Sequence, residues 1–231
     1  MNATSLILAL VALGLALLAL VFLLPRRNLL PRAPEPRPGV PGMRPPHLPS
    51  GTFLDAGHTW LRIAPDGSLR IGVDAFLAEA LGRVERVHLP APGRWVGRGE
   101  ALLELELGGR RLRLFSPVEG EVQRVNEALE EQPGRLTDDP YGNGWALTIW
   151  SRNHKAAIRP LKIGPVAVSF LRRELEHLLD FLPRTEGRAA SPLLADGGLP
   201  RRGVLAELGE RGWPLFQQEF LDPVVRRASP P

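Results

Sequence analysis

The sequence predicts a mainly β protein that has an N-terminal transmembrane helix and a C-terminal helical extension. Two runs of alternating apolar and charged residues meet at Gly108 and Gly109, an apolar run covers residues 6–24, and apolar residues recur at helical spacing over residues 165–182. A period of two is typical of a half-buried strand, and a period of three to four is typical of a helix. The expected domains are an anchor at 1–24, a linker at 25–50, a β domain at 51–152 and a helical extension at 153–231.

The N-terminal run is long enough to cross a membrane. Residues 6–24 are apolar apart from Gly14, and a helix of about 19 residues spans roughly 28 Å. A cleaved signal peptide is the competing interpretation. The first five residues carry no basic side chain, and no small-residue cleavage site follows Leu24, so an anchor is favoured.

The segment after the apolar run indicates the topology. It contains one acidic residue, Glu35, and five arginines, which are Arg26, Arg27, Arg32, Arg37 and Arg44. By the positive-inside rule the C-terminal part is expected in the cytoplasm, as the soluble part of a single-pass membrane protein. A solvated linker and a site for anionic lipid headgroups are the alternatives for these arginines. Nine of the residues 25–49 are proline, so this segment is expected to be an extended spacer.

A β-hairpin is the strongest local prediction. Two glycines between alternating runs favour a two-residue turn with positive φ at both positions. With Gly108 and Gly109 as the turn, charged pairs lie on the solvent face and leucine pairs on the buried face. The predicted pairs are Glu106 with Arg111, Glu104 with Arg113, Leu105 with Leu112, and Leu103 with Leu114.

The remaining strands are expected on both sides of this hairpin. Residues 60–63 and 69–73 alternate around a turn at Asp66 and Gly67. Asp74 is expected to cap a short helix that ends at Gly82. Further strands are expected at 84–89, 101–107, 111–115, 121–125 and 146–150.

Several motifs around the hairpin carry a family resemblance. They are HTWLRIAPDGSLRIGV from His58, ALGRVERVHLP from Ala80, GRWVGRGE from Gly93, SPVEGEV from Ser116, VNEALE from Val125 and DDPYGNGW from Asp138. In this order and spacing they resemble the H protein of the glycine cleavage system, over about residues 57–150. The resemblance implies a lipoyl-like fold, a barrel-sandwich hybrid in which two small sheets pack face to face.

The resemblance also implies a carrier site that this chain has lost. In that family the hairpin carries a lipoylated lysine that shuttles an aminomethyl group between enzymes. Counting back from Pro117 puts Gly109 at that position, and a lipoyl amide needs an amine that glycine lacks. Lys155 and Lys162 are the only lysines, and both lie outside the hairpin. No lipoyl group or other cofactor is therefore expected.

The extension is expected to contain a helix at 165–182 and shorter helices at 202–209 and 215–221, with a loop at 183–192. Its aromatic cluster, Trp213, Phe216, Phe220 and Leu221, has two interpretations. It covers the first helix within a small helical subdomain with its own core, or it is an interface that receives a partner protein.

Composition and motifs do not indicate catalysis. The five histidines lack the spacing of metal ligands on one helix face, and cysteine is absent. Ser116 lacks the context of a nucleophile elbow, and His58, within a family motif, is expected in packing or a turn hydrogen bond. A net charge of +4 does not indicate a nucleic-acid partner. We expect no catalytic residue, no metal and no small-molecule substrate.

Two functions remain, and a third is weaker. The first is a membrane-anchored scaffold or subunit of a membrane-associated complex, with protein partners at the cytoplasmic face. The second is an unmodified decoy or regulator that docks on lipoate-dependent or one-carbon enzymes. The third is a periplasmic adaptor, because such adaptors also place a lipoyl-like domain after a single anchor, although they usually interrupt it with a long helical hairpin.

Overall fold

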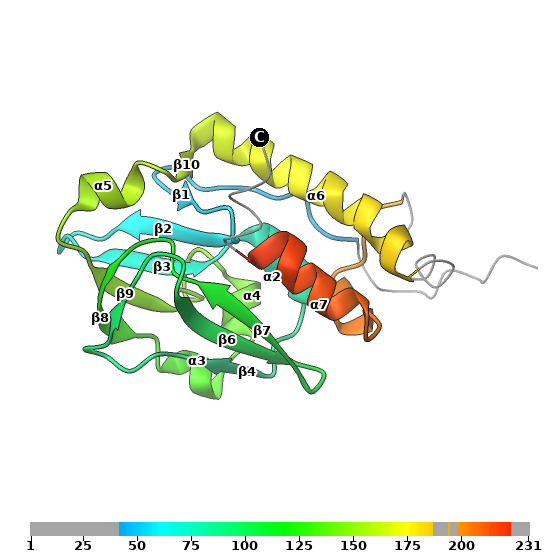
Figure 1. Ribbon diagram of the computed structural model, residues 1–231, viewed down its shortest axis with the longest axis horizontal. Coiled ribbons are helices and arrows are strands. Elements are labelled where there is room, and N and C mark those ends of the chain that lie inside the picture. Colours follow the sequence, from blue (N-terminus) through cyan, green and yellow to red (C-terminus); the bar gives the residue numbers. More distant parts are fainter. Residues whose placement is uncertain (1–41, 187–193, 195–197, 223–231) are drawn as a thin grey trace, which may run out of the picture. The chain divides into compact units, whose positions relative to one another are not determined.

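Two antiparallel sheets form the centre of the described domain (Figure 1). The computed structural model describes residues 42–186, 194 and 198–222. One sheet has seven strands in the order β10-β1-β2-β3-β9-β8-β5, and the other has three in the order β4-β6-β7. Their bounds are β1 Phe53–Leu54, β2 Thr59–Ile63, β3 Leu69–Val73, β4 Arg86–His88, β5 Trp95–Val96, β6 Ala101–Leu107, β7 Arg110–Phe115, β8 Gly120–Val125, β9 Leu147–Trp150 and β10 Lys162–Ile163. The prediction of a mainly β protein is confirmed.

The β2–β3 hairpin forms as its sequence predicts. Asp66 Oδ1 accepts hydrogen bonds from the Ser68 amide at 2.9 Å and the Ser68 hydroxyl at 2.7 Å, and Gly67 has a φ of 81°. In the register Trp60 faces Gly72. A Cβ at position 72 would lie 2.8 Å from the Trp60 indole, so the glycine makes room for the ring.

Helix α2 (Ala75–Leu81) follows β3 and is buried along its whole length. Asp74 caps it, because its Oδ1 accepts a hydrogen bond from the Leu77 amide at 2.9 Å. The helix ends at Gly82, whose φ is 65°. Both ends therefore lie where the capping pattern predicts them.

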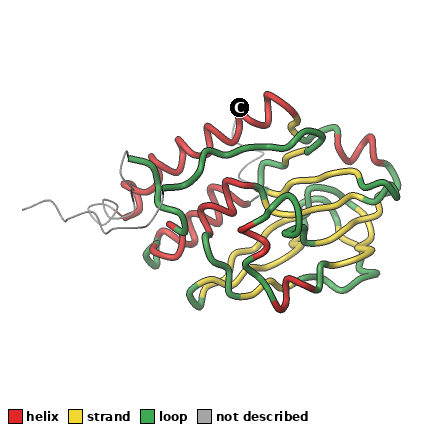
Figure 2. Tube along the Cα trace, turned by 180° about the vertical axis from the view of Figure 1, so that it is seen from behind, coloured by secondary structure: helices red, strands yellow, loops and turns green. Residues whose placement is uncertain are grey.

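The C-terminal extension packs on the β domain instead of forming a core of its own. Helix α6 (Gly164–Glu186) contacts α2, β1 and β10. The other elements of the extension are η2 (Val204–Glu207), α7 (Gly212–Phe216), which also contacts α6, and η3 (Gln217–Leu221). Figure 2 shows these helices beside the sheets. One buried cluster contains Trp60 and Leu105 from the sheets and Phe181 and Phe220 from the extension. The alternative of a separate helical core is therefore not what the structure shows.

The boundaries of the extension differ from the prediction at two places. Helix α6 continues through Pro183 to Glu186, whereas a loop was expected from residue 183. Phe181 and Leu182 are buried there, and the Thr185 hydroxyl donates to the Phe181 carbonyl at 3.0 Å, so packing and this bond hold the last turn. The expected helix at 202–209 is a single 3₁₀ turn, η2, and the one at 215–221 is split between α7 and the π-helical η3.

Three short helices and three two-residue strands were not predicted. The helices are α3 (Ala128–Glu131), α4 (Arg135–Asp138) and α5 (His154–Ile158), and the strands are β1, β5 and β10. None is long enough to show a hydrophobic period.

The end of the expected linker belongs to the folded unit. Met43 is buried, and its amide donates to the Pro200 carbonyl at 2.7 Å. Within residues 42–186, 194 and 198–222, no helix has the length and apolar character needed to cross a membrane. The expected anchor at residues 6–24 lies outside the described residues.

Candidate functional site: the β6–β7 hairpin

The β6–β7 hairpin has the predicted register. Leu105 pairs with Leu112 and Leu103 with Leu114, and all four side chains are buried. A shift in the pairing between Ala101 and Leu103 bends the base of the hairpin. The leucines fix the register, because a slip of one residue would turn them all to the solvent.

Ion pairs line the solvent face of this hairpin. Glu106 Oε1 lies 2.7 Å from Arg111 Nη2, and Glu104 Oε1 lies 3.0 Å from Arg113 Nε. His88, on the neighbouring strand β4, extends the row, with its Nε2 at 2.9 Å from Glu106 Oε1. The hydrogen bond from His88, together with Arg111, lowers the pKa of Glu106. The four charged hairpin residues thus bond to one another and present no free base.

The tip consists of Gly108 and Gly109, with φ of 58° and 71°. Both lie in the left-handed region, as predicted, and a Cβ on either would meet no atom within 4 Å. The Gly108 amide donates to Glu85 Oε1 at 3.1 Å. The tip is therefore open and could hold a side chain, but neither residue supplies one.

The chain's own extension covers the outer edge of β7. The Gln217 side chain accepts a hydrogen bond from the Arg113 amide at 2.8 Å and donates to the Arg113 carbonyl at 2.9 Å. Trp213 Nε1 donates to the Arg111 carbonyl at 3.1 Å. Arg110 donates to the Leu208 carbonyl and lies over the Trp213 ring. These contacts substitute for a fourth strand and fix the hairpin against α7 and η3.

The aromatic cluster, for which a partner interface was one of two interpretations, is buried within the fold. Phe216, Phe220 and Leu221 are fully buried, and Trp213 is 8% exposed. Phe220 stacks on Phe216 and His177, with ring centroids 4.5 and 4.4 Å apart. The cluster covers α6, where Phe181 contacts both phenylalanines edge to face, but it does so within the core shared with the β domain and not within a separate helical core.

A groove of about 600 Å³ lies beside the hairpin. Leu81 and Leu107 give it apolar walls, and Gly82 and Gly203 also line it. Arg83 adds positive charge, whereas Arg202 is paired with Asp138 at 2.9 Å. Gly82 and Gly203 approach so closely that a Cβ on Gly82 would lie 2.6 Å from the Gly203 Cα. The extension thus completes this groove through η2.

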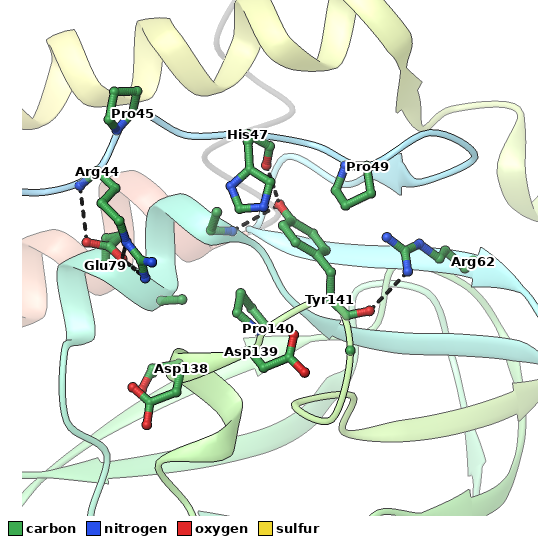
Figure 3. Close-up of a pocket in the computed structure, with 14 residues that line it drawn as sticks. Arg44, Pro45, His47, Pro49, Arg62, Glu79, Asp138, Asp139, Pro140 and Tyr141 are labelled. Atoms are coloured by element: carbon green, nitrogen blue, oxygen red, sulfur yellow. Dashed lines mark hydrogen bonds and ion pairs between the residues drawn. The ribbon is translucent and has the colours of Figure 1, made fainter.

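A second groove, of about 580 Å³, lies between the linker end and α2 (Figure 3). Arg44 Nη2 lies 2.6 Å from Glu79 Oε1, and the Tyr141 hydroxyl donates to the His47 carbonyl at 3.0 Å. Burial raises the pKa of Tyr141, so its phenol stays neutral and donates. Arg62 donates to the Tyr141 carbonyl at 3.0 Å. The polar groups here hold residues 44–49 against the domain.

His58 lies at a buried junction between the domain and the extension. Its Nδ1 is 2.8 Å from Asp74 Oδ2 and its Nε2 is 3.3 Å from Glu174 Oε2, on α6. Burial alone would lower the pKa of His58, but the charges and hydrogen bonds of Asp74 and Glu174 raise it to about 9. The imidazolium therefore joins the two carboxylates. The packing role expected for His58 fits this geometry.

The other residues considered for chemistry lie apart from one another. The Ser116 hydroxyl is buried and donates to the Val118 carbonyl at 2.6 Å. Lys155 and Lys162 are in α5 and β10, outside the hairpin. Across the described ranges, no three His, Cys, Asp or Glu side chains are grouped to hold a metal ion.

Gln217 and Glu174 are the site residues that the sequence did not reveal. Each acts on a residue more than one hundred positions away, Arg113 and His58 respectively. A polar residue on an amphipathic helix has no local signal for such a partner. For Glu174, its position beside the apolar stripe of α6 was the one sequence feature that could have indicated burial.

Comparison with known proteins finds glycine cleavage H proteins. The family model described as "Glycine cleavage H-protein" matches residues 53–164. The glycine cleavage system H protein of Hydrogenovibrio crunogenus is 38% identical over 102 residues, which are 44% of this chain and 79% of that protein. The probable glycine cleavage system H protein of Thermococcus kodakarensis is 32% identical over 122 residues, 53% of this chain and 90% of that one.

The chain belongs to the glycine cleavage H-protein family. A crystal structure of a glycine cleavage system H protein from Mycobacterium marinum is 29% identical, with a TM-score of 0.46, and covers 55% of this chain and 98% of that chain. The family match ends at Gly164, where α6 begins. The helices that hold the β7 edge and Glu174 are therefore outside the matched region.

Proposed function

We propose that this chain is an H-protein family member that carries no lipoyl group and acts as a non-catalytic scaffold or subunit of a membrane-associated complex. The observation that carries the proposal is the hairpin tip. Gly108 and Gly109 are open to solvent and lie in a family-matched domain, but they offer no amine for a lipoyl amide. The carrier shape is kept without the group that makes it a carrier.

The covered edge of β7 supports a fixed rather than a shuttling role. Gln217, Trp213 and Arg110 bond the hairpin to the extension, so the hairpin is braced by residues outside the family match. A brace of this kind suits a structural subunit, because it holds one surface in one geometry.

Anchoring and topology complete the proposal. The apolar run at 6–24 serves as a single-pass anchor, and the arginines after it keep the folded domain in the cytoplasm. Protease added to intact cells should spare the domain, whereas protease added to inverted vesicles should release it by cutting within 25–41. Cleavage in intact spheroplasts would contradict the topology and favour the periplasmic adaptor.

A second candidate is a decoy or regulator of lipoate-dependent or one-carbon enzymes. The near-complete coverage of the relatives, 79% and 90% of their lengths, favours it, since a docking surface for such enzymes would lie in that region. Gentle solubilisation of the tagged full chain, followed by identification of co-purifying proteins, separates the candidates. Membrane-complex subunits support the scaffold, and enzymes that use lipoyl carriers support the decoy.

A further inference from the structure

Positive charge is concentrated in one segment. Residues 151–173 contain six basic residues and no acidic one, although the whole chain has 29 basic and 25 acidic residues. The six are Arg152, Lys155, Arg159, Lys162, Arg172 and Arg173, and they include both lysines of the protein. The segment comprises α5, β10 and the first turns of α6.

The fold gathers this segment at one end of the domain. Figures 1 and 2 show α5, β10 and the start of α6 together, at the end away from the tip of the β6–β7 hairpin. Arg173 follows Val166 by seven residues on α6, so both lie on the same helix face. The positive residues thus lie on elements at one end of the domain, away from the hairpin tip.

Four cations of this end have no carboxylate partner within the described part of the chain. Arg152, Lys155, Arg159 and Arg173 are exposed, and no ion pair joins them to a described Asp or Glu. The hairpin arginines differ, because Arg111 and Arg113 bond to glutamates. A surface of unpaired cations is complementary to an anionic partner.

Large apolar side chains are exposed among these cations. Val166 is 62% exposed, Ile163 and Trp150 are 46% exposed, and Trp95, which lies under the Arg152 guanidinium, is 49% exposed. Glu121 of β8 pairs with Trp95 of β5 and with Trp150 of β9, so one acidic residue lies between the two tryptophans, and the positive residues lie on the side of α5, β10 and α6. Tryptophans and aliphatic side chains mixed with arginine and lysine are typical of surfaces that rest on lipid headgroups.

We propose that the basic end surface, formed by Trp95, Trp150, Arg152, Lys155, Arg159 and Val166, docks on anionic phospholipids of the bilayer. The basic side chains bind lipid phosphates, while the tryptophans and Val166 enter the headgroup layer. The inference rests on the proposed anchoring. Seventeen residues, 25–41, separate the apolar run from the described domain, and an extended chain of that length reaches about 50 Å. That reach exceeds the roughly 35 Å length of a 23-residue helix such as α6, so the anchored domain can bring this end to the membrane.

Tryptophan quenching in nanodiscs tests the docking. The full-length protein is incorporated into nanodiscs of phosphatidylcholine with brominated acyl chains, with and without phosphatidylglycerol. We expect phosphatidylglycerol to increase quenching of the exposed tryptophans, and the variant R152Q/K155Q/R159Q to lose at least about half of that increase. The control R86Q/R135Q/R211Q removes the same charge from exposed sites elsewhere and should quench like the parent.

The results that would contradict docking can be distinguished from a failure of the proposed membrane anchor. The docking proposal is overturned if quenching does not change when phosphatidylglycerol is added, or if it decreases equally in both triple variants. A third result also overturns it: R152Q/K155Q/R159Q is quenched like the parent but no longer co-purifies with an acidic protein. The surface would then bind a protein and not the lipid. Anchoring is read independently, from resistance of the protein to extraction from membranes by alkaline carbonate.

Discussion

His58 Nδ1 lies 2.8 Å from Asp74 Oδ2, and both side chains are fully buried. Asp74 also caps α2, and the other nitrogen of His58 faces Glu174 of α6. His58 has a φ of 61°, and its carbonyl accepts a hydrogen bond from the Asp74 amide at 3.0 Å. One buried imidazolium thus joins a turn, a helix cap and the C-terminal extension.

This junction predicts a pH-dependent stability. The pKa of His58 is about 9 in the folded protein, above its ordinary value of 6.5. Its contribution is therefore fully present below about pH 6.5 and is lost as the pH rises through about 9. We expect the melting temperature of the parent to fall across this range.

The variant His58→Asn provides the control for that prediction. Asparagine tolerates positive φ but does not titrate, so its melting temperature should be lower at pH 6 and should change less between pH 6.5 and 9. Equal pH profiles for the parent and this variant would show that His58 does not carry the charge.

Substitutions at the hairpin tip should lower the stability of the protein through backbone conformation alone. Replacing Gly108 and Gly109 with valine meets no neighbouring atom, but it puts β-branched residues at positive φ. We expect a loss of about 2–4 kcal/mol in the free energy of unfolding, measured by urea denaturation. The double asparagine variant should lose much less. Matching stabilities for the parent and the double valine variant would refute the turn geometry.

The brace on β7 predicts a local change in hydrogen exchange. Gln217→Ala removes both bonds to the Arg113 backbone, so the Arg113 amide should exchange faster while β2 and β3 stay protected. The global loss should be about 1 kcal/mol. Gln123→Ala, at an exposed position of β8, is the control. Unchanged exchange at Arg113 would mean that Gln217 does not brace the hairpin.

The shared core predicts that the extension cannot be removed. Truncation after residue 160 deletes β10, α6 and the core side chains Phe181, Phe216 and Phe220. We expect the remaining chain to lack cooperative unfolding, measured by circular dichroism during heating. A truncated protein that melts cooperatively near the parent temperature would show an independent β domain.

The local elements were predictable because their signals are local. Alternation around Gly108 and Gly109 sets a register, and Asp74 and Gly82 mark the ends of a helix. Those patterns depend on neighbours within a few residues. The sequence therefore predicted the hairpin pairs and the limits of α2.

The contacts between distant segments were not predictable in the same way. An aromatic cluster such as Phe216 and Phe220 suits a core or an interface, and the fold decides between them by placing α6 against it. Gln217 and Glu174 acquire roles only when the extension lies against β7 and His58. The continuation of α6 past Pro183 also depends on tertiary packing, since proline alone favours an end.

The intact mass of the full-length protein, purified from its own membranes, tests the central claim most directly. The hairpin of this family member has glycine where a lipoyl amide would need an amine, so the mass should equal that of the unmodified chain apart from N-terminal processing. Peptide mapping should find Lys155 and Lys162 unmodified. A mass increase of one lipoyl group that maps to either lysine would contradict the account and restore a carrier function.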